Sequence, residues 1–119
     1  MENCIFCMII EHQVPAEILY EDEDMVVIQD AHPLAPIHLL VIPRKHIPSM
    51  NEITQTEEAL LSRLFLKGRE MAFAKGIGET GYRLVVNTGT GGGQTVFHLH
   101  VHLLGGAPVD NQLLSRGLK

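Results

Sequence analysis

The sequence predicts an α+β domain in which an antiparallel sheet packs against helices on one side. Two observations indicate this class: strand-like segments outnumber helix-like segments, and successive strand-like segments are joined by short links. The chain has 119 residues, the size of one domain, and 45% of them are hydrophobic, enough for a buried core. We therefore predict a single domain over residues 1–119.

The first half of the chain predicts a short helix, a hairpin and a central strand. Residues 4–11, CIFCMIIE, form the short helix. β-forming residues over 18–21 and 25–29 flank the acidic run 21–24, which suits the solvated tip of a hairpin. After a loop with two prolines, residues 37–43, IHLLVIP, are mostly apolar on both faces, which indicates a central strand.

The longest predicted helix covers about residues 57–75. Thr54 and Glu57 have the spacing of a capping box, which marks its beginning. Apolar residues recur at steps of three and four and form a core-facing stripe: Leu60, Leu61, Leu64, Phe65, Met71 and Ala72. Glycines end the helix, and two more predicted strands, 82–87 and 96–106, flank a glycine-rich loop at 88–95.

Composition and charge exclude several classes of function. The formal net charge is −5, which argues against a nucleic-acid-binding protein, since such proteins present a basic face. No apolar run reaches the roughly 18 residues of a membrane span, and the start of the chain does not resemble a signal peptide. We therefore expect a cytoplasmic location and no membrane partner. In that compartment the pair Cys4-x-x-Cys7 indicates metal or redox chemistry before a disulfide.

Three histidines, His98, His100 and His102, occupy alternate positions of the last predicted strand. Side chains alternate across a strand, so the histidines share one face. The opposite face, which we expect to pack under the helices, carries Phe97, Leu99, Val101 and Leu103. His98 and His102 would lie about 13 Å apart at Cα, too far for one metal ion to bind all three histidines. A row of solvent-facing polar residues is the alternative, but the glycine-rich loop directly before them favours a functional site.

The loop TGTGGGQT indicates what kind of group the histidines could act on. Gly91–Gly93 can adopt conformations that point several N–H groups into one concavity, and Gln94 and Thr95 add side-chain donors. A polyglycine loop alone is more often a flexible turn. Beside a row of histidines it predicts a phosphate held against a nucleophile, since neutral imidazole is a competent nucleophile near pH 7. His100, with a histidine on either side, is the natural attacking residue.

The segment HLHVHLL resembles the signature of the histidine-triad (HIT) superfamily, His-φ-His-φ-His-φ-φ, where φ is hydrophobic. The resemblance extends through CIFCMII, YEDEDMVVIQDAHPLAPIHLLVIPRKHI and GYRLVVNTGTGGGQTVFHLHVHLLGG, and it looks like the Hint branch. It implies a HIT-like fold: a curved five-stranded antiparallel sheet with one long and one short helix, joined across a homodimer. It also implies a phosphoramidase that binds AMP- or GMP-type nucleotides, hydrolyses adenosine 5′-phosphoramidates and similar aminoacyl-adenylates, and needs no cofactor for catalysis.

The resemblance also implies roles for individual residues. His100 matches the nucleophile that forms a covalent nucleotidyl-histidine, and His102 matches the histidine that contacts phosphate. Thr95 stands near the leaving group, His38 matches a buried histidine that supports the triad, and the Asp30 carboxylate accepts the ribose hydroxyls. The remaining matches are phosphate contacts and apolar walls around the base: Ile5, Phe6, Ile9, Ile28, Asn87, Gly93, Gln94 and Val96.

Some members of the superfamily bind structural zinc, and the matching positions here are Cys4, Cys7, His46 and His98. Two thiolates and two imidazoles complete a tetrahedral zinc site. Such a zinc would be structural, because no coordination position is left for water. The alternative is a pair of small buried thiols on a short helix, with His46 capping a loop.

Two other functions are compatible with the sequence. One is a dinucleoside-polyphosphate hydrolase of another HIT branch, which GGGQT favours less than a phosphoramidase. The other is an interaction protein that responds to nucleotide and whose catalysis is incidental. Gln29 and Ala31 depart from residues that relatives often carry beside Asp30, and the tail lacks the tryptophan of some relatives. The base contacts and the leaving-group preference of these relatives therefore cannot be assigned to this chain.

Overall fold

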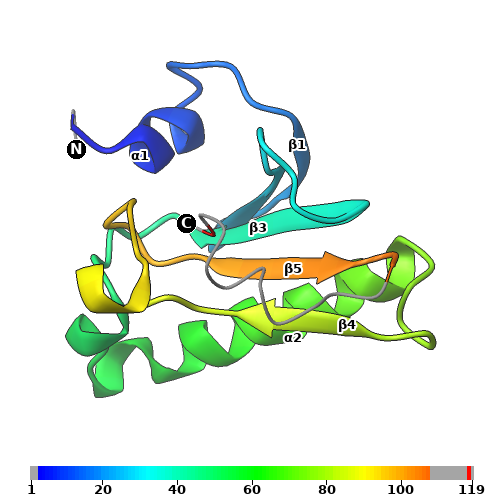
Figure 1. Ribbon diagram of the computed structural model, residues 1–119. Coiled ribbons are helices and arrows are strands. Elements are labelled where there is room, and N and C mark those ends of the chain that lie inside the picture. The colour runs from blue at the N-terminus through cyan, green and yellow to red at the C-terminus, as the bar shows by residue number, and fades with distance from the viewer. Residues whose placement is uncertain (1–2, 108–117, 119) are drawn as a thin grey trace.

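The computed structural model describes residues 3–107 and 118, which form one curved five-stranded antiparallel sheet and two α-helices (Figure 1). The strand order is β1-β2-β3-β5-β4. The strands are β1 (Ile18–Glu21), β2 (Met25–Gln29), β3 (Ile37–Pro43), β4 (Tyr82–Val85) and β5 (Val101–Gly105). The helices are α1 (Ile5–Ile10) and α2 (Glu58–Ala74). The predicted α+β class and the five-stranded sheet are confirmed. Among these residues no helix is both long and apolar enough to span a membrane.

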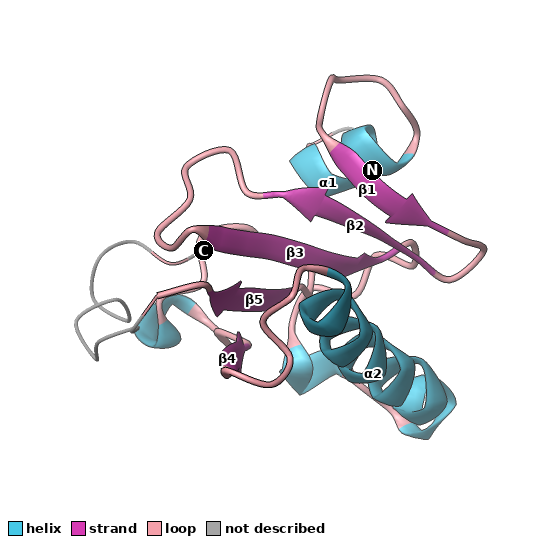
Figure 2. Ribbon diagram, turned by 90° about the vertical axis from the view of Figure 1, so that its right-hand side faces the viewer, coloured by secondary structure: helices cyan, strands magenta, loops and turns pink. Residues whose placement is uncertain are grey.

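The two helices cover opposite faces of the sheet (Figures 1 and 2). Alternate residues of β2 and β3 point to each face. Val27, Leu39 and Val41 pack on the side of α2 with Leu64, while Val26, Ile28, Leu40 and Ile42 pack on the side of α1 with Phe6. The prediction of helices on one side only is therefore wrong. Because β2 and β3 are apolar on both faces, each face needs a cover, and the short helix α1 supplies the second one.

Strand β5 begins at Val101, five residues later than predicted. Residues 96–100 are irregular and run against the segment 44–49, where the Leu99 N–H donates to the Ile47 carbonyl at 2.7 Å. Leu99 still points into the α2 side of the core, as expected. Phe97 is 46% exposed, so its predicted packing under a helix is wrong. From Val101 onward β5 lies between β3 and β4, where His102 pairs with Leu40 and Val85.

The predicted capping box is present and holds the segment 44–49 to the beginning of α2. Thr54 and Glu57 bond reciprocally around a 3-10 turn, and α2 begins one residue later, at Glu58. The Lys45 ammonium lies 2.6 Å from a Glu57 carboxylate oxygen. Lys45 and the Thr54 donors together lower the pKa of Glu57 to about 2. His46, Ile47 and Pro48, which follow Lys45, are thereby fixed beside the histidine segment.

Candidate active site and metal centre

All three histidines of the triad are buried between α1 and the sheet. The exposed fractions of His98, His100 and His102 are 0%, 4% and 0%, so these residues are not a solvent-facing polar row. Phe6 of α1 contacts two of them edge-on, at centroid distances of 6.0 Å to His98 and 5.0 Å to His100. The central strand β3 adds His38, which is 1% exposed. Buried imidazoles hold defined orientations here because each one bonds to the protein.

The hydrogen bond of His100 fixes which ring nitrogen is reactive. Its Nδ1 lies 2.7 Å from the His98 backbone carbonyl oxygen. A carbonyl only accepts, so Nδ1 carries the proton and Nε2 of the neutral ring keeps its lone pair. Phe6 packs at 82° to the ring and restricts its rotation. The ring nitrogen of His100 that could act as a nucleophile is therefore Nε2.

A chain of hydrogen bonds gives His102 the tautomer opposite to that of His100, with the proton on Nε2. The Leu34 N–H donates to Nδ1 of His38 at 3.0 Å, so the neutral His38 ring carries its proton on Nε2. That Nε2 lies 3.0 Å from Nδ1 of His102, which accepts, and the proton of His102 is therefore on Nε2. The rings of His100 and His102 are neighbours, with centroids 4.9 Å apart. A ring with a nitrogen lone pair and a ring with an N–H donor are thus neighbours, a combination that suits phosphoryl chemistry.

Backbone N–H groups of the glycine-rich loop donate hydrogen bonds within the loop itself and do not form an open nest. Gly92 and Gly93 donate to the carbonyls of Gly89 and Thr90 at 3.1 and 3.0 Å. Of the N–H groups of Gly91–Gly93, from which we expected several to point into one concavity, those of Gly92 and Gly93 are thus bonded within the loop. Gly89 and Gly93 have φ values of 72° and 90°, in the left-handed region that glycine tolerates. The glycines are needed for the tight turn.

Gln94, predicted to contact phosphate, is 3% exposed and joins the loop to its surroundings. Its Oε1 accepts from the Gly89 N–H at 2.9 Å. Its Nε2 donates to the carbonyls of Pro48 and Val96 at 2.8 and 3.0 Å. The Gln94 side chain therefore shapes the loop from within, next to the segment that carries His46.

Asn87 and the end of the chain meet at a point that the sequence did not predict. The Asn87 side-chain amide donates to the Leu118 carbonyl at 2.9 Å. Leu118 is 2% exposed and packs with Leu34, Val85 and Leu104. The tail has no hydrophobic period, so nothing in its sequence indicated that Leu118 would lie beside a predicted phosphate contact.

The predicted apolar walls lie along α1. Phe6, Ile9 and Ile28 are buried together, and Val96 packs against them, whereas Ile5 is 41% exposed. Ile5, Thr95 and Val96 share a surface pocket of about 460 Å³. Its remaining lining residues are Asn3, Cys4, Met8, His46 and Phe97. The fold thus brings three of the predicted nucleotide-site residues to one hollow beside the triad segment.

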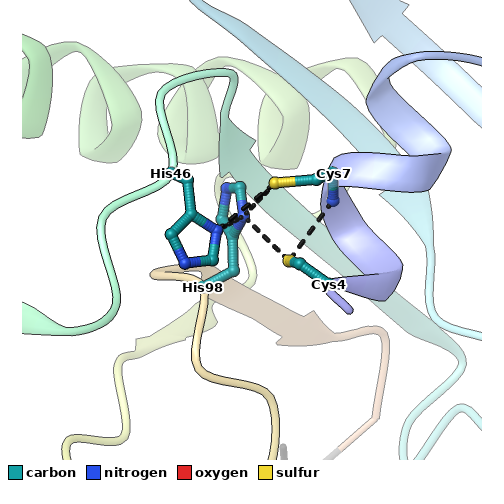
Figure 3. A group of neighbouring side chains, drawn as sticks. All are labelled: Cys4, Cys7, His46 and His98. Atoms are coloured by element: carbon teal, nitrogen blue, oxygen red, sulfur yellow. Dashed lines mark hydrogen bonds between the residues drawn. The ribbon is translucent and has the colours of Figure 1, made fainter. Parts of the chain in front are cut away.

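Cys4, Cys7, His46 and His98 point toward one centre from three parts of the chain (Figure 3). The His98 Nδ1 is 3.3 Å from Cys4 Sγ, 3.5 Å from Cys7 Sγ and 3.1 Å from His46 Nδ1. The distance from Cys7 Sγ to His46 Nδ1 is 3.3 Å. Neighbouring ligand atoms of a tetrahedral zinc lie about 3.3–3.8 Å apart, given ordinary zinc–sulfur and zinc–nitrogen bond lengths. The residues present therefore fit such an ion in kind and number, and all but the 3.1 Å distance between the two histidines fall within this range.

The protonation of this cluster also suits a metal. Nε2 of His98 donates to the Pro43 carbonyl at 2.7 Å, which leaves a lone pair on Nδ1, the atom that faces the cysteines. Burial lowers the pKa of His98 to about 4, so the ring is neutral at pH 7. Burial and the hydrogen bond that the Cys7 thiol makes to Cys4 raise the pKa of Cys7 to about 11 when no metal is bound. A bound cation would favour the thiolate instead.

Comparison with known proteins agrees with this arrangement. A family described as "Scavenger mRNA decapping enzyme C-term binding" matches residues 3–113. The purine nucleoside phosphoramidase of Escherichia coli K12 is 41% identical over 117 residues, which cover 98% of each chain. The chain belongs to the histidine-triad superfamily. A HIT family hydrolase from Legionella pneumophila has the same fold, with a TM-score of 0.89 and 42% identity over 92% of this chain and 97% of that one.

The HIT match identifies the enzyme class and bears on the metal cluster. One relative along the full length is named a purine nucleoside phosphoramidase, and two solved structures of the same fold are named HIT family hydrolases; this chain is accordingly a HIT family hydrolase. A Zn-bound histidine triad family protein from Mycobacterium smegmatis also has this fold. Its TM-score is 0.78, with 30% identity over 92% of this chain and 79% of that one.

Proposed function

We propose that this HIT hydrolase is a purine nucleoside phosphoramidase that cleaves the P–N bond of adenosine 5′-phosphoramidates and the P–O anhydride bond of similar substrates such as aminoacyl-adenylates. The observation that carries the proposal is the bond from His100 Nδ1 to the His98 carbonyl, which places the ring proton on Nδ1 and the lone pair on Nε2, the nitrogen that can attack phosphorus. The E. coli relative with the same activity in its name supports this substrate class.

The reaction proceeds in two displacements. Nε2 of His100 attacks phosphorus, the P–N bond breaks, and the amine leaves after receiving a proton from solvent, so that the nucleotide is bound to the ring. The His98 carbonyl keeps its bond to Nδ1–H and stabilises the positive charge that the ring acquires. The Nε2–H of His102 binds a phosphate oxygen. Water then cleaves the bond between phosphorus and Nε2, which releases AMP and restores neutral His100.

The remaining contacts follow the roles implied by the superfamily. Asp30 accepts the ribose hydroxyls, Thr95 lies near the leaving group, and Asn87 contacts phosphate. Gly93 and Gln94 support this contact by shaping the loop. The walls of the base site are Ile5, Phe6, Ile9, Ile28 and Val96. These assignments make AMP or GMP the expected ligand.

We also propose a homodimer joined along β4. Strand β4 pairs with β5 on one side and, within residues 3–107 and 118, with no strand on the other. Leu66 and Phe73 are 48% and 53% exposed and lie seven residues apart on α2, so they share one face of that helix. An open strand edge and two exposed apolar side chains support pairing with a second copy.

A comparison of two substrate classes tests the activity. We expect turnover of an adenosine 5′-phosphoramidate, with release of AMP and amine, at a rate far above that for diadenosine tetraphosphate. The reverse order would favour the dinucleoside-polyphosphate hydrolase. Binding of AMP without turnover of either substrate would instead favour the nucleotide-responsive interaction protein, and pull-down with and without AMP would then identify partners.

Cys4, Cys7, His46 and His98 are proposed to bind a structural zinc ion. Both histidines present Nδ1 to the two thiols, and a Zn-bound member of the superfamily has the same fold. Four protein ligands complete the tetrahedron, so this zinc organises the chain and takes no part in the reaction.

We predict about one zinc ion per chain in protein purified without chelator or added metal, measured by elemental analysis. His46→Ala should lose the zinc because it removes one ligand. His32→Ala is the matched control, since this exposed histidine lies outside the cluster, and it should retain the metal. Wild-type protein without zinc, or zinc retained in both variants, would contradict the assignment.

A further inference from the structure

Asp30 is locked against His38 at the end of β2. Its backbone N–H donates to the His38 carbonyl at 3.0 Å. Its Oδ1 accepts from the His32 N–H at 2.8 Å, and its Oδ2 lies 3.4 Å from Nε2 of His38. The carboxylate is therefore fixed by the backbone on one side and directed at an imidazole on the other.

The burial of Asp30 indicates that the carboxylate works within the protein. The side chains of Asp30 and His38 are each 1% exposed, and His102 is 0% exposed. Most of the surface of this carboxylate therefore faces groups of the protein, whatever part of it a bound ribose contacts. A buried charge is costly unless a polar group faces it, and the His38 ring does so here.

We infer that Asp30 is a positioning residue of the active site, acting through His38 on His102. An ionised carboxylate only accepts, so it favours a proton on the His38 nitrogen that it faces, Nε2. The same nitrogen lies 3.0 Å from Nδ1 of His102. A proton on His38 Nε2 keeps His102 Nδ1 unprotonated and leaves the His102 proton on Nε2.

The Leu34 N–H acts in the same direction from the other side of the His38 ring, since it donates to Nδ1. Both contacts therefore specify one tautomer of His38, and through it one tautomer of His102. The inference rests on the proposed function, because it matters for catalysis only if His102 donates to the phosphate. It adds to the ribose role a second role that is independent of the ribose.

Two substrates separate the roles. Asp30→Asn is measured on an adenosine 5′-phosphoramidate and on the matched 2′,3′-dideoxyadenosine compound, which has no hydroxyls for Asp30 to bind. We expect kcat to fall about tenfold or more on both substrates, since an amide can donate to Nε2 of His38 and thus compete with the tautomer that the Leu34 N–H favours. Asp24→Asn is the control, because this carboxylate pairs with Arg63 at the surface, and its kcat should not change.

A role confined to the ribose gives the opposite pattern: a higher KM on the adenosine substrate and no change on the dideoxy substrate. That result would overturn the inference. If wild-type protein turns over neither substrate, the proposed function fails, and the tautomers still decide the role of Asp30.

Ring ¹⁵N chemical shifts of the nucleotide-free protein supply that independent readout. In wild type we expect protonated Nε2 and unprotonated Nδ1 on both His38 and His102, and in Asp30→Asn a mixture of tautomers. This measurement on wild type also covers the case in which Asp30→Asn does not fold. A proton on Nδ1 of wild-type His38, or unchanged tautomers in a folded Asp30→Asn variant, would overturn the inference.

Discussion

Replacing His100 with alanine is expected to lower phosphoramidate turnover by about 10⁴-fold or more, while AMP still binds. No neighbouring histidine can take over the attack. Nε2 of His102 carries a proton, because its Nδ1 accepts from His38. His98 is fully buried, with Nε2 bonded to Pro43 and Nδ1 directed at the cysteines. Turnover is measured by AMP release, and binding by calorimetry with AMP.

His12→Asn is the matched control, since His12 is a histidine with 61% of its side chain exposed, and it should retain full activity. His100→Gly offers a second test of the same role. Added imidazole can occupy the space of the missing ring beside Phe6 and should restore part of the turnover. Near-normal activity of His100→Ala would refute the assignment of His100 as the nucleophile, and the covalent mechanism would have to be abandoned.

Local patterns predicted most of the sheet. The bounds of β1, β2 and β3 agree with the predicted segments 18–21, 25–29 and 37–43, because runs of β-forming residues are bounded there by polar turns. The last strand was predicted too long at its beginning. Leu99 bonds to Ile47, fifty-two residues earlier, and no periodicity within the segment 96–106 reports a contact at that distance along the chain.

For the site, as for the sheet, the sequence predicted the types of residue but not where the fold places them. Three alternating histidines indicated a nucleophile, but the proton positions follow from the His98 carbonyl and the Leu34 N–H, which only the fold brings into contact. The pair Cys4-x-x-Cys7 predicts half of a metal site by itself. His46 lies beside this pair because of the position of the segment 44–49, which the ion pair of Lys45 and Glu57 holds to α2. Sequence spacing does not encode such long-range contacts.

The cluster carries the largest expected effect on stability. Cys7→Ala should lose the zinc and lower the free energy of unfolding by more than about 3 kcal/mol, because metal binding contributes directly to folding. Met8→Ala in the same helix is the control. It truncates a larger, half-buried side chain that is not a ligand, so it removes more atoms and should nevertheless cost less. Urea unfolding of both variants measures the difference.

Treatment with a chelator distinguishes the stabilisation by bound metal from the stabilisation by packing of the Cys7 thiol. A strong chelator should lower the melting temperature of wild type and of Met8→Ala, but leave that of Cys7→Ala unchanged, because that variant has no zinc to lose. Chelated wild type should also lose turnover, since His98 contributes Nδ1 to the cluster and its carbonyl to the bond that orients His100. Equal destabilisation of the two variants, with no effect of the chelator, would mean that the cysteines act only as buried apolar groups. The position of His98 would then depend on its contacts with Pro43, Phe6 and His46.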